Sequence, residues 1–262
     1  MATADNYGEH RVAVWAAALA YYGLFSIFPL LLFLIYLGTD VLATPDARNT
    51  LHDLMMQTIP AGVDNMTEIV NHTLDLRGPI GLIGAIGLIW SASAVFAALE
   101  GALNRIWGGE PRPFWGRRLL ASASILLLSV AFVLLLTASQ FVPLLLDYLT
   151  LETGEEFSGT LILISLILVI FLVHRSFPNR KVGRWPALAA AVFSGLALSL
   201  ARSAFDAFLN STFANYGAVY GSLAWIVSLG IWTYIAGTLF LLGAEIGHTL
   251  DERGAFDALE KL

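Results

Sequence analysis

The chain has 262 residues, of which 57% are hydrophobic, 13% are charged and none is cysteine. The charged fraction is about half the ~25% of an ordinary globular protein, which leaves too few ionisable side chains to cover a soluble fold. The lack of cysteine excludes disulfides, thiolate metal sites and cysteine nucleophiles. A net charge of −6 provides no general attraction to nucleic acid. The composition therefore predicts an integral membrane protein of the all-α class.

Uncharged apolar runs recur along the chain, and a helix needs roughly 20 such residues to cross a bilayer. No linker divides the runs, so we expect one polytopic membrane domain over residues 1–262. The first run is too long for the apolar region of a signal peptide, so no cleaved leader is expected. The six predicted transmembrane helices span residues 12–42, 79–105, 117–148, 158–176, 185–209 and 219–249.

Basic residues are distributed unevenly between the connections. Residues 104–118 and 174–184 each carry four Lys or Arg side chains, whereas residues 147–156 carry four acids and no base. Lys and Arg are enriched on the cytoplasmic side of membrane proteins. The pattern predicts that both termini are cytoplasmic.

Residues 44–77, between the first two helices, are the only sizeable segment expected outside the membrane. Thr44-Pro45-Asp46 has the hydroxyl cap, first-position proline and early acid of a helix start. Apolar residues then recur at helical spacing on both sides of Pro60. We expect two short amphipathic helices on the outer face, which lie on the membrane, cap the bundle or bind an envelope partner.

Two glutamates lie near the expected cytoplasmic ends of their helices. Glu100 is ~30 Å along the second helix and Glu245 ~39 Å along the sixth, at 1.5 Å per residue. With Asn104, they form either structural anchors or a cytoplasmic gate or proton-linked site. The candidate anchoring partners are Arg105, Arg117 and Arg11.

Arg202 and Asp206 lie toward the outer half of the fifth helix. Their i, i+4 spacing places them on one face, where they can neutralise each other as an internal ion pair. The alternative is that Arg202 lines an aqueous cavity and meets an anionic group of a substrate or lipid. A stripe of small residues beside them predicts close helix packing rather than chemistry; it comprises Ala187, Ala191, Gly195, Ser199 and Ser203.

The first helix carries polar groups near the middle of the bilayer. Tyr21 and Tyr22 are ~14 Å in from Val12 at 1.5 Å per residue, so their hydroxyls need partners there. Pro29 removes one backbone hydrogen bond, and Ser26 can satisfy part of the freed backbone. These residues indicate either a transport site at a kink or the ordinary proline kink of a helical bundle.

The sequence contains no recognisable catalytic constellation. Its five histidines follow no metal-ligand spacing, and the cytoplasmic connections of about ten residues are too short to build a nuclease site. We therefore expect a protein that is not an enzyme, with no catalytic residue, cofactor or bound metal.

Several motifs resemble those of the YihY/BrkB family of bacterial inner-membrane proteins, formerly labelled ribonuclease BN. They lie in the expected order over nearly the whole chain: Ala17–Leu30, Ile89-Trp90-Ser91-Ala92-Ser93, Ala102–Trp107, Pro178-Asn179-Arg180, Tyr220–Ala224 and Leu242-Gly243-Ala244-Glu245. Gly247 departs from the polar residue that the family more often has there. That departure weakens the case for a fixed polar site at the inner end of the last helix.

The resemblance implies a multi-pass protein of the bacterial inner membrane, with no agreed substrate. Family members have been labelled as a tRNA-processing ribonuclease and as a serum-resistance factor, but no residue pattern here supports a nuclease. We expect a transporter or lipid-handling protein with a polar pathway framed by helices one, five and six. The alternative is a scaffolding protein that binds an envelope partner through residues 44–77. Membrane lipids are the expected partners, nucleic acid is not, and a homo-oligomer is left open.

Overall fold

The computed structural model describes four main stretches, residues 8–37, 79–110, 155–209 and 223–255, together with the isolated residues 49, 52, 53, 56, 112, 113 and 116. These residues contain no strand, which agrees with the predicted all-α class. The long helices are α2 (Val12–Leu37), α5 (Pro79–Trp107), α7 (Glu155–Ser176), α8 (Arg184–Phe208) and α10 (Leu223–Glu252).

These five helices correspond to five of the six predicted ones, with ends that differ by up to five residues. The predicted third helix at 117–148 and most of the segment at 44–77 lie outside the described residues. Within the described residues, Arg184–Phe208 and Ala224–Glu252 are long and apolar enough to cross a membrane, and Val12–Ser26 and Leu163–Ser176 are shorter apolar stretches.

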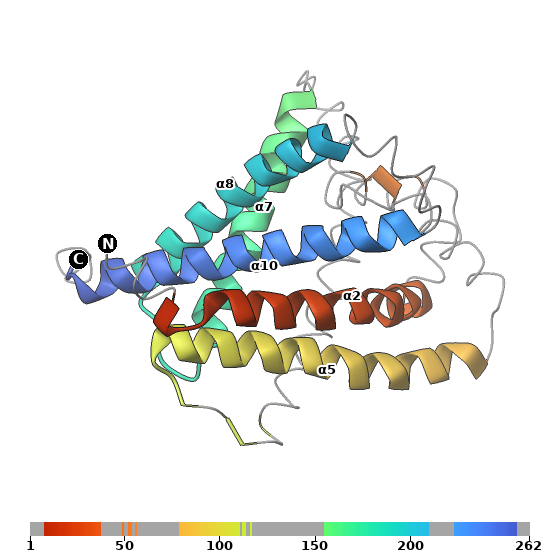
Figure 1. The fold of residues 1–262 in the computed structure, drawn as a ribbon, viewed down its shortest axis with the longest axis horizontal. Coiled ribbons are helices and arrows are strands. Elements are labelled where there is room, and N and C mark those ends of the chain that lie inside the picture. The colour runs from red at the N-terminus through yellow and green to blue at the C-terminus, as the bar shows by residue number, and fades with distance from the viewer. Residues whose placement is uncertain are drawn as a thin grey trace, which may run out of the picture.

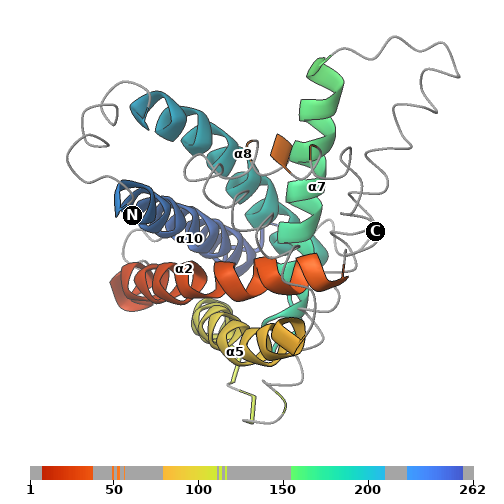
Figure 2. The ribbon, with the colours of Figure 1, turned by 90° about the vertical axis from the view of Figure 1, so that its right-hand side faces the viewer.

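The helices form a series of packed neighbours in the order α7, α8, α10, α2 and α5 (Figures 1 and 2). In Figure 1, α2, α5 and α10 run side by side, while α8 crosses α10 at an angle. The start of α2, the ends of α5 and α10, and the turn between α7 and α8 gather at one end of the bundle. We call this the inner end.

Two of the helices stop at the inner end through the same backbone motif. Gly108, with φ +68°, follows α5, and Gly109 donates its N–H to the carbonyl of Asn104 at 2.8 Å. At the end of α10, Gly254 has φ +67°, and Ala255 donates to the carbonyl of Leu250 at 3.1 Å. A glycine in this left-handed conformation lets the next N–H satisfy a carbonyl of the last helical turn.

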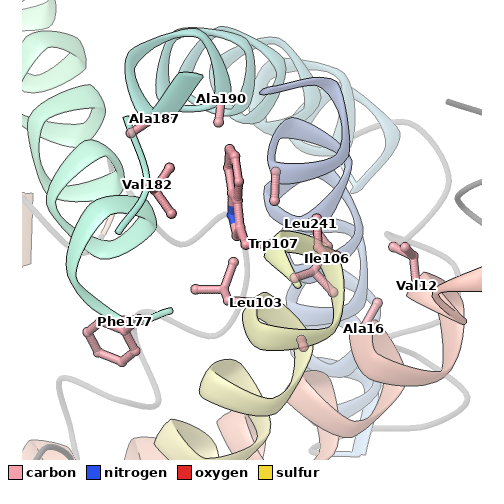
Figure 3. Close-up of a cluster of buried hydrophobic side chains, with 12 residues drawn as sticks. Val12, Ala16, Leu103, Ile106, Trp107, Phe177, Val182, Ala187, Ala190 and Leu241 are labelled. Atoms are coloured by element: carbon pink, nitrogen blue, oxygen red, sulfur yellow. The ribbon is translucent and has the colours of Figure 1, made fainter. Parts of the chain in front are cut away.

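The apolar core also lies at the inner end. Figure 3 shows the indole of Trp107, at the end of α5, directed toward Ala187 and Ala190 of α8. The buried cluster comprises Val12, Ala16, Ala102, Leu103, Ile106, Trp107, Phe177, Val182, Ala187, Ala190, Leu241 and Ala244. It includes side chains from α2, α5, α8 and α10, so one cluster holds these four helices together.

Small residues bring α8 and α10 into close contact near this core. A Cβ atom on Gly247 would lie 2.6 Å from the carbonyl oxygen of Pro186, and one on Gly243 would lie 2.6 Å from that of Ala190. The predicted stripe is buried at Ala187, Ala191 and Gly195, while its last two members, Ser199 and Ser203, are exposed. Close packing through small side chains is therefore confined to the first half of α8.

Candidate functional site

The three polar residues predicted as an anchor or a gate are all buried at the inner end. Glu100 and Asn104 lie one turn apart near the end of α5, and Glu245 lies near the end of α10. The exposed fraction is 1% for Glu100 and 0% for Glu245. A buried carboxylate is stabilised only by charged or hydrogen-bonding partners, so those partners determine what each residue can do.

Glu100 is bound by an arginine from the chain that follows α5. Its Oε1 accepts a hydrogen bond from Nη1 of Arg112 at 3.1 Å, one from the Arg112 backbone N–H at 3.4 Å, and one from Nδ2 of Asn104 at 3.4 Å. Arg105, a predicted partner of the glutamates, instead donates to the carbonyl of Glu9 at 3.4 Å. Spacing along the helix suggested Arg105, but the return of the chain after Gly108 brings Arg112 to the carboxylate.

The same arginine connects α5 to the turn between α7 and α8. Arg112 Nη1 also donates to the carbonyl of Phe177 at 2.7 Å, and Nη2 donates to that of Pro178 at 3.4 Å. Asn104 Oδ1 accepts the backbone N–H of Asn179 at 2.6 Å, and Arg180 Nη1 donates to the carbonyl of Trp107 at 2.8 Å. The end of α5 and this turn therefore form one hydrogen-bonded unit.

Glu245 has a histidine as its partner. Its Oε1 lies 2.7 Å from Nδ1 of His10, which is 235 residues away in the sequence. Its Oε2 is buried and has no hydrogen-bond partner among the described residues. Neither of the arginines suggested for this role within the described residues, Arg11 and Arg105, forms an ion pair with it there.

The backbone before α2 directs His10 to this contact. Arg11 has φ +54°, a left-handed conformation that costs a residue with a Cβ atom about 1–2 kcal/mol. Its N–H donates to the carbonyl of Gly8 at 3.1 Å, which makes a tight turn before the helix begins at Val12. Strained backbone of this kind persists where surrounding contacts hold it, and the His10–Glu245 contact is one of these.

His248 lies beside the Glu245 pair. Its Nε2 is 3.3 Å from Oε1 of Glu252, and its ring centroid is 5.7 Å from that of Trp107 and 6.3 Å from that of His10. Nδ1 of His248 is buried with no hydrogen-bond partner in the described part of the chain. His10, Glu245, His248 and Glu252 thus form a group of titratable side chains that lead from the interior to the surface, where Glu252 is 60% exposed.

A third histidine is fully enclosed away from this group. His174, near the end of α7, stacks on Phe240 of α10 with ring centroids 4.4 Å apart. Neither ring nitrogen has a hydrogen-bond partner among the described residues. The ring therefore acts mainly as a flat packing surface between α7 and α10.

The candidate pathway residues on α2 are not joined to this site. Tyr21 and Tyr22 are exposed, with ring centroids 5.3 Å apart, and Tyr21 also packs on Phe25 at 4.9 Å. Ser26 is buried and donates to the carbonyl of Gly23 at 3.0 Å. The helix continues past Pro29 to Leu37. Among the described contacts, none links these residues to Arg202 or Asp206.

Arg202 and Asp206 do not form the ion pair that their spacing suggested. Arg202 is half-buried, and its Nη2 donates to the backbone carbonyl of Met56 at 2.8 Å. Asp206 is exposed, and no ion pair joins the two within the described residues. The guanidinium reaches a neighbouring segment instead, so the expected coupling between these residues is wrong for this structure.

Sequence reasoning found the two buried glutamates but missed most of their partners. His10, Arg112 and His248 were not predicted as site residues, because no histidine pattern was recognised and Arg112 was considered only as part of the basic connection after α5. Within the described residues, no group of three His, Asp or Glu side chains is placed to hold a metal ion. The motif Pro178-Asn179-Arg180 is part of the family resemblance in the sequence, and two of its residues bind the end of α5.

Several known proteins are similar to this chain. The ribonuclease-like protein YfkH of Bacillus subtilis is 31% identical over 262 residues, which cover 95% of this chain and 94% of that protein. A UPF0761 membrane protein of Acinetobacter baylyi is 29% identical over 94% of this chain and 59% of its own length. A UPF0761 membrane protein of Pseudoalteromonas atlantica is 23% identical over 92% of this chain and 81% of its own length.

No solved structure matches the chain. The family model described as Virulence factor BrkB matches residues 3–261, which is nearly the whole sequence. The relatives from Acinetobacter baylyi and Pseudoalteromonas atlantica are named as membrane proteins, in agreement with the apolar helices. The chain belongs to the BrkB family of membrane proteins.

Proposed function

We propose that this BrkB-family protein is a non-enzymatic, multi-pass transporter or lipid-handling protein of the bacterial inner membrane, with a gate at the inner end. The observation that carries the proposal is the burial of two carboxylates, Glu100 and Glu245, at the end where the helices meet. Glu245 joins two segments distant in the sequence directly, and Glu100 does so through Arg112, which also binds the carbonyl of Phe177.

A gate of this kind has a physical rationale. A bundle that only has to stay closed can be held by the apolar core and the small residues of α8 and α10, without burying charge. A polar bridge can be broken by the binding of one proton or by one side-chain rearrangement. The helices that it joins can then separate at a defined place. Buried ionisable groups in membrane proteins are accordingly associated with substrate and ion pathways.

The proposed topology has six spans and two cytoplasmic termini. In support, the start of α2 and the end of α10 meet at His10 and Glu245, and Arg112 and Arg180 of the two basic connections are bound at the inner end. The cysteine-free chain permits single-cysteine variants with no background labelling. A membrane-impermeant maleimide should label Gly154→Cys in intact spheroplasts, but Ala2→Cys and Leu262→Cys only after permeabilisation. Labelling of a terminal cysteine in intact spheroplasts would contradict this topology.

The lipid-handling form of the proposal can be tested in vesicles. The purified protein is reconstituted in phosphatidylethanolamine and phosphatidylglycerol with a trace of fluorescent phosphatidylglycerol, and dithionite then bleaches only the outer leaflet. Movement between leaflets raises the bleached fraction above the half found in protein-free vesicles. We expect Glu245→Gln to change the rate and Asp206→Asn, which alters an exposed acid, to leave it unchanged. Identical bleaching with and without protein would exclude lipid movement.

The alternative scaffolding function has one supporting contact. Arg202 of α8 binds the carbonyl of Met56, which lies within the predicted outer segment 44–77. A scaffold would require that segment to bind an envelope partner, whereas the same contact also fits a segment that caps its own bundle. Crosslinking in cells from a photoreactive residue at position 56 separates these outcomes, because capping gives only crosslinks within the chain.

We also propose that the protein does not cleave RNA, although one relative bears a ribonuclease-like name. A nuclease needs positioned acids, bases or metal ions beside a basic cleft. Purified protein incubated with tRNA and Mg²⁺ should leave it intact. Cleavage that survives repurification and disappears in Glu100→Gln or Glu245→Gln would refute this.

A further inference from the structure

We propose that Glu245 and His10 form a proton-binding pair that exchanges its proton with water at the inner end through His248 and Glu252. The inference rests on the transport function proposed above and names the proton as the coupling ion of that process. It concerns the α10 carboxylate and not Glu100.

The type of partner distinguishes Glu245 from Glu100. Glu100 faces Arg112, whose guanidinium stays charged at every physiological pH. Glu245 faces His10, and imidazole is the side chain that gains and loses charge near neutrality. At a separation of 2.7 Å, the imidazole and the carboxylate share one hydrogen bond, so the pair is neutral overall when it holds a single proton.

The burial of Glu245 makes its charge depend on that proton. Its side chain is 0% exposed, and Oε2 has no hydrogen-bond partner among the described residues. A charged carboxylate in such a place is unfavourable without a positive neighbour. Removing the shared proton leaves an uncompensated buried charge, whereas adding a second one converts Glu245 to the neutral acid beside a charged His10.

A route to water is present in the same group. His248 lies between His10 and Glu252, with a ring-centroid distance of 6.3 Å on one side and an Nε2–Oε1 distance of 3.3 Å on the other. The two rings share no direct hydrogen bond, and Nδ1 of His248 is buried without a partner in the described part of the chain, so proton transfer between the histidines requires one of the rings to move. Glu252, at 60% exposure, ends the route in solvent.

The surroundings contain few competing charges. The charged groups near His248, besides His10, are Arg180 from the turn between α7 and α8 and Asp251 and Glu252 on α10, and Glu252 also lies near Glu245. From α5 and α8, the nearby residues are Trp107, Pro186 and Ala190, which do not titrate. His10 is therefore the only cationic partner that the described elements place in contact with Glu245.

The proton step also has a structural consequence. A proton entering at Glu252 passes to His248 and then to the pair, and no covalent bond other than O–H and N–H is made or broken. The doubly protonated pair loses its ionic attraction, and the segment at residues 8–11 is then held less firmly to α10. Proton binding thereby loosens the contact that closes the inner end.

Infrared difference spectroscopy of the reconstituted protein during pH cycling tests this directly. We expect a carbonyl stretch of a protonated carboxylic acid that titrates, disappears in Glu245→Gln, and persists in Glu100→Gln and Asp206→Asn. Glu245→Asp should restore the band at a shifted frequency, which guards against a variant that fails to fold. His10→Gln should displace the titration midpoint, and Glu252→Gln should slow exchange after a pH jump. A band that is absent from the parent, or unchanged in Glu245→Gln and Glu245→Asp, would overturn the proposal.

The spectroscopic measurement tests the proton site and the vesicle measurement tests lipid handling, so the two proposals can be rejected independently. The carboxyl band reports proton binding when nothing is transported, and dithionite bleaching reports lipid movement whether or not protons bind. A titrating Glu245 without lipid movement would retain the proton site and reject lipid handling. Lipid movement without a titrating Glu245 would reject the proton site alone.

Discussion

Glu100 and Glu245 occupy comparable positions and have different partners. Both are fully buried near the inner end of a long helix, and both use Oε1 for their shortest described contact. Glu100 is held by an arginine that also binds two carbonyls of the α7–α8 turn. Glu245 is held by one histidine from the segment before α2. Two equally buried carboxylates therefore differ in their electrostatic surroundings, because one partner has a permanent charge and the other does not.

The difference extends to how each pair is assembled. Arg112 follows Glu100 by 12 residues, so a single change of chain direction after Gly108 is enough to bring them together. His10 and Glu245 are 235 residues apart and meet only when the two ends of the fold are in place. The first pair strengthens one corner of the bundle, whereas the second joins its first and last described helices.

The largest expected effect comes from removing the permanent charge. Arg112→Met leaves Glu100 buried without its cation, and breaking a buried pair in this way typically costs about 3–5 kcal/mol. Thermal unfolding in detergent, followed by intrinsic tryptophan fluorescence, should show a markedly lower midpoint. The double variant Glu100→Gln with Arg112→Met should recover most of the loss. A single variant that unfolds like the parent would show that Arg112 is not what stabilises Glu100.

Removal of the histidine should have a smaller effect. His10→Ala leaves Glu245 without its hydrogen-bond donor, for which about 1–3 kcal/mol is typical. The carboxyl of Glu245 can respond by binding a proton itself, which limits the loss of stability. Glu245→Gln with His10→Ala should be at least as stable as His10→Ala alone. If His10→Ala destabilises the protein as much as Arg112→Met, the proposed contrast between the two sites is wrong.

Enlarging the glycine at the contact between α8 and α10 should destabilise the protein, whereas enlarging an uncrowded glycine on α10 should not. In Gly247→Ala, the new methyl would lie 2.6 Å from the carbonyl of Pro186, and overpacking against backbone costs about 1 kcal/mol or more. Gly230→Ala is the matched control on the same helix, because nothing lies within 4 Å of its Cβ position, and it should gain about 0.5–1 kcal/mol. The same fluorescence measurement compares them. Equal behaviour of the two variants would show that α8 and α10 have room to separate.

The smallest effect is expected at the third acid considered, Asp206. It is exposed and forms no ion pair within the described residues, so Asp206→Asn should change the unfolding free energy by less than about 0.5 kcal/mol. Arg202→Gln should cost about 0.5–1.5 kcal/mol through the lost bond to Met56. The two effects should add in the double variant. A clear deviation from additivity would restore the direct coupling that the structure lacks.

The sequence was a good guide to local features. Long apolar runs predicted five described helices, because burying a backbone in an apolar environment requires every N–H and C=O to be bonded within the segment. The position of Glu100 and Glu245 near helix termini, beside basic connections, was also predicted, whereas their burial was shown only by the structure. The BrkB-type motifs predicted the family that the comparisons show.

The ion-pair partners could not be obtained in the same way. The i, i+4 rule places Arg202 and Asp206 on one face, but a long guanidinium can reach any acceptor within several ångströms, and here it reaches Met56. In the sequence, Gly247 argues against a fixed polar site at the inner end of α10. The structure instead shows that this glycine admits the backbone of Pro186 next to Glu245 and His248.

The sequence by itself determined the features that depend on neighbouring residues: an all-helical chain, the approximate ends of its described helices, and two acids near helix ends. Only the tertiary structure decided which acid faces arginine and which faces histidine. That choice depends on how the turn after α5 returns, on the left-handed backbone at Arg11, and on how closely α8 approaches α10. These are distances between segments far apart in the chain, and helical periodicity carries no information about them.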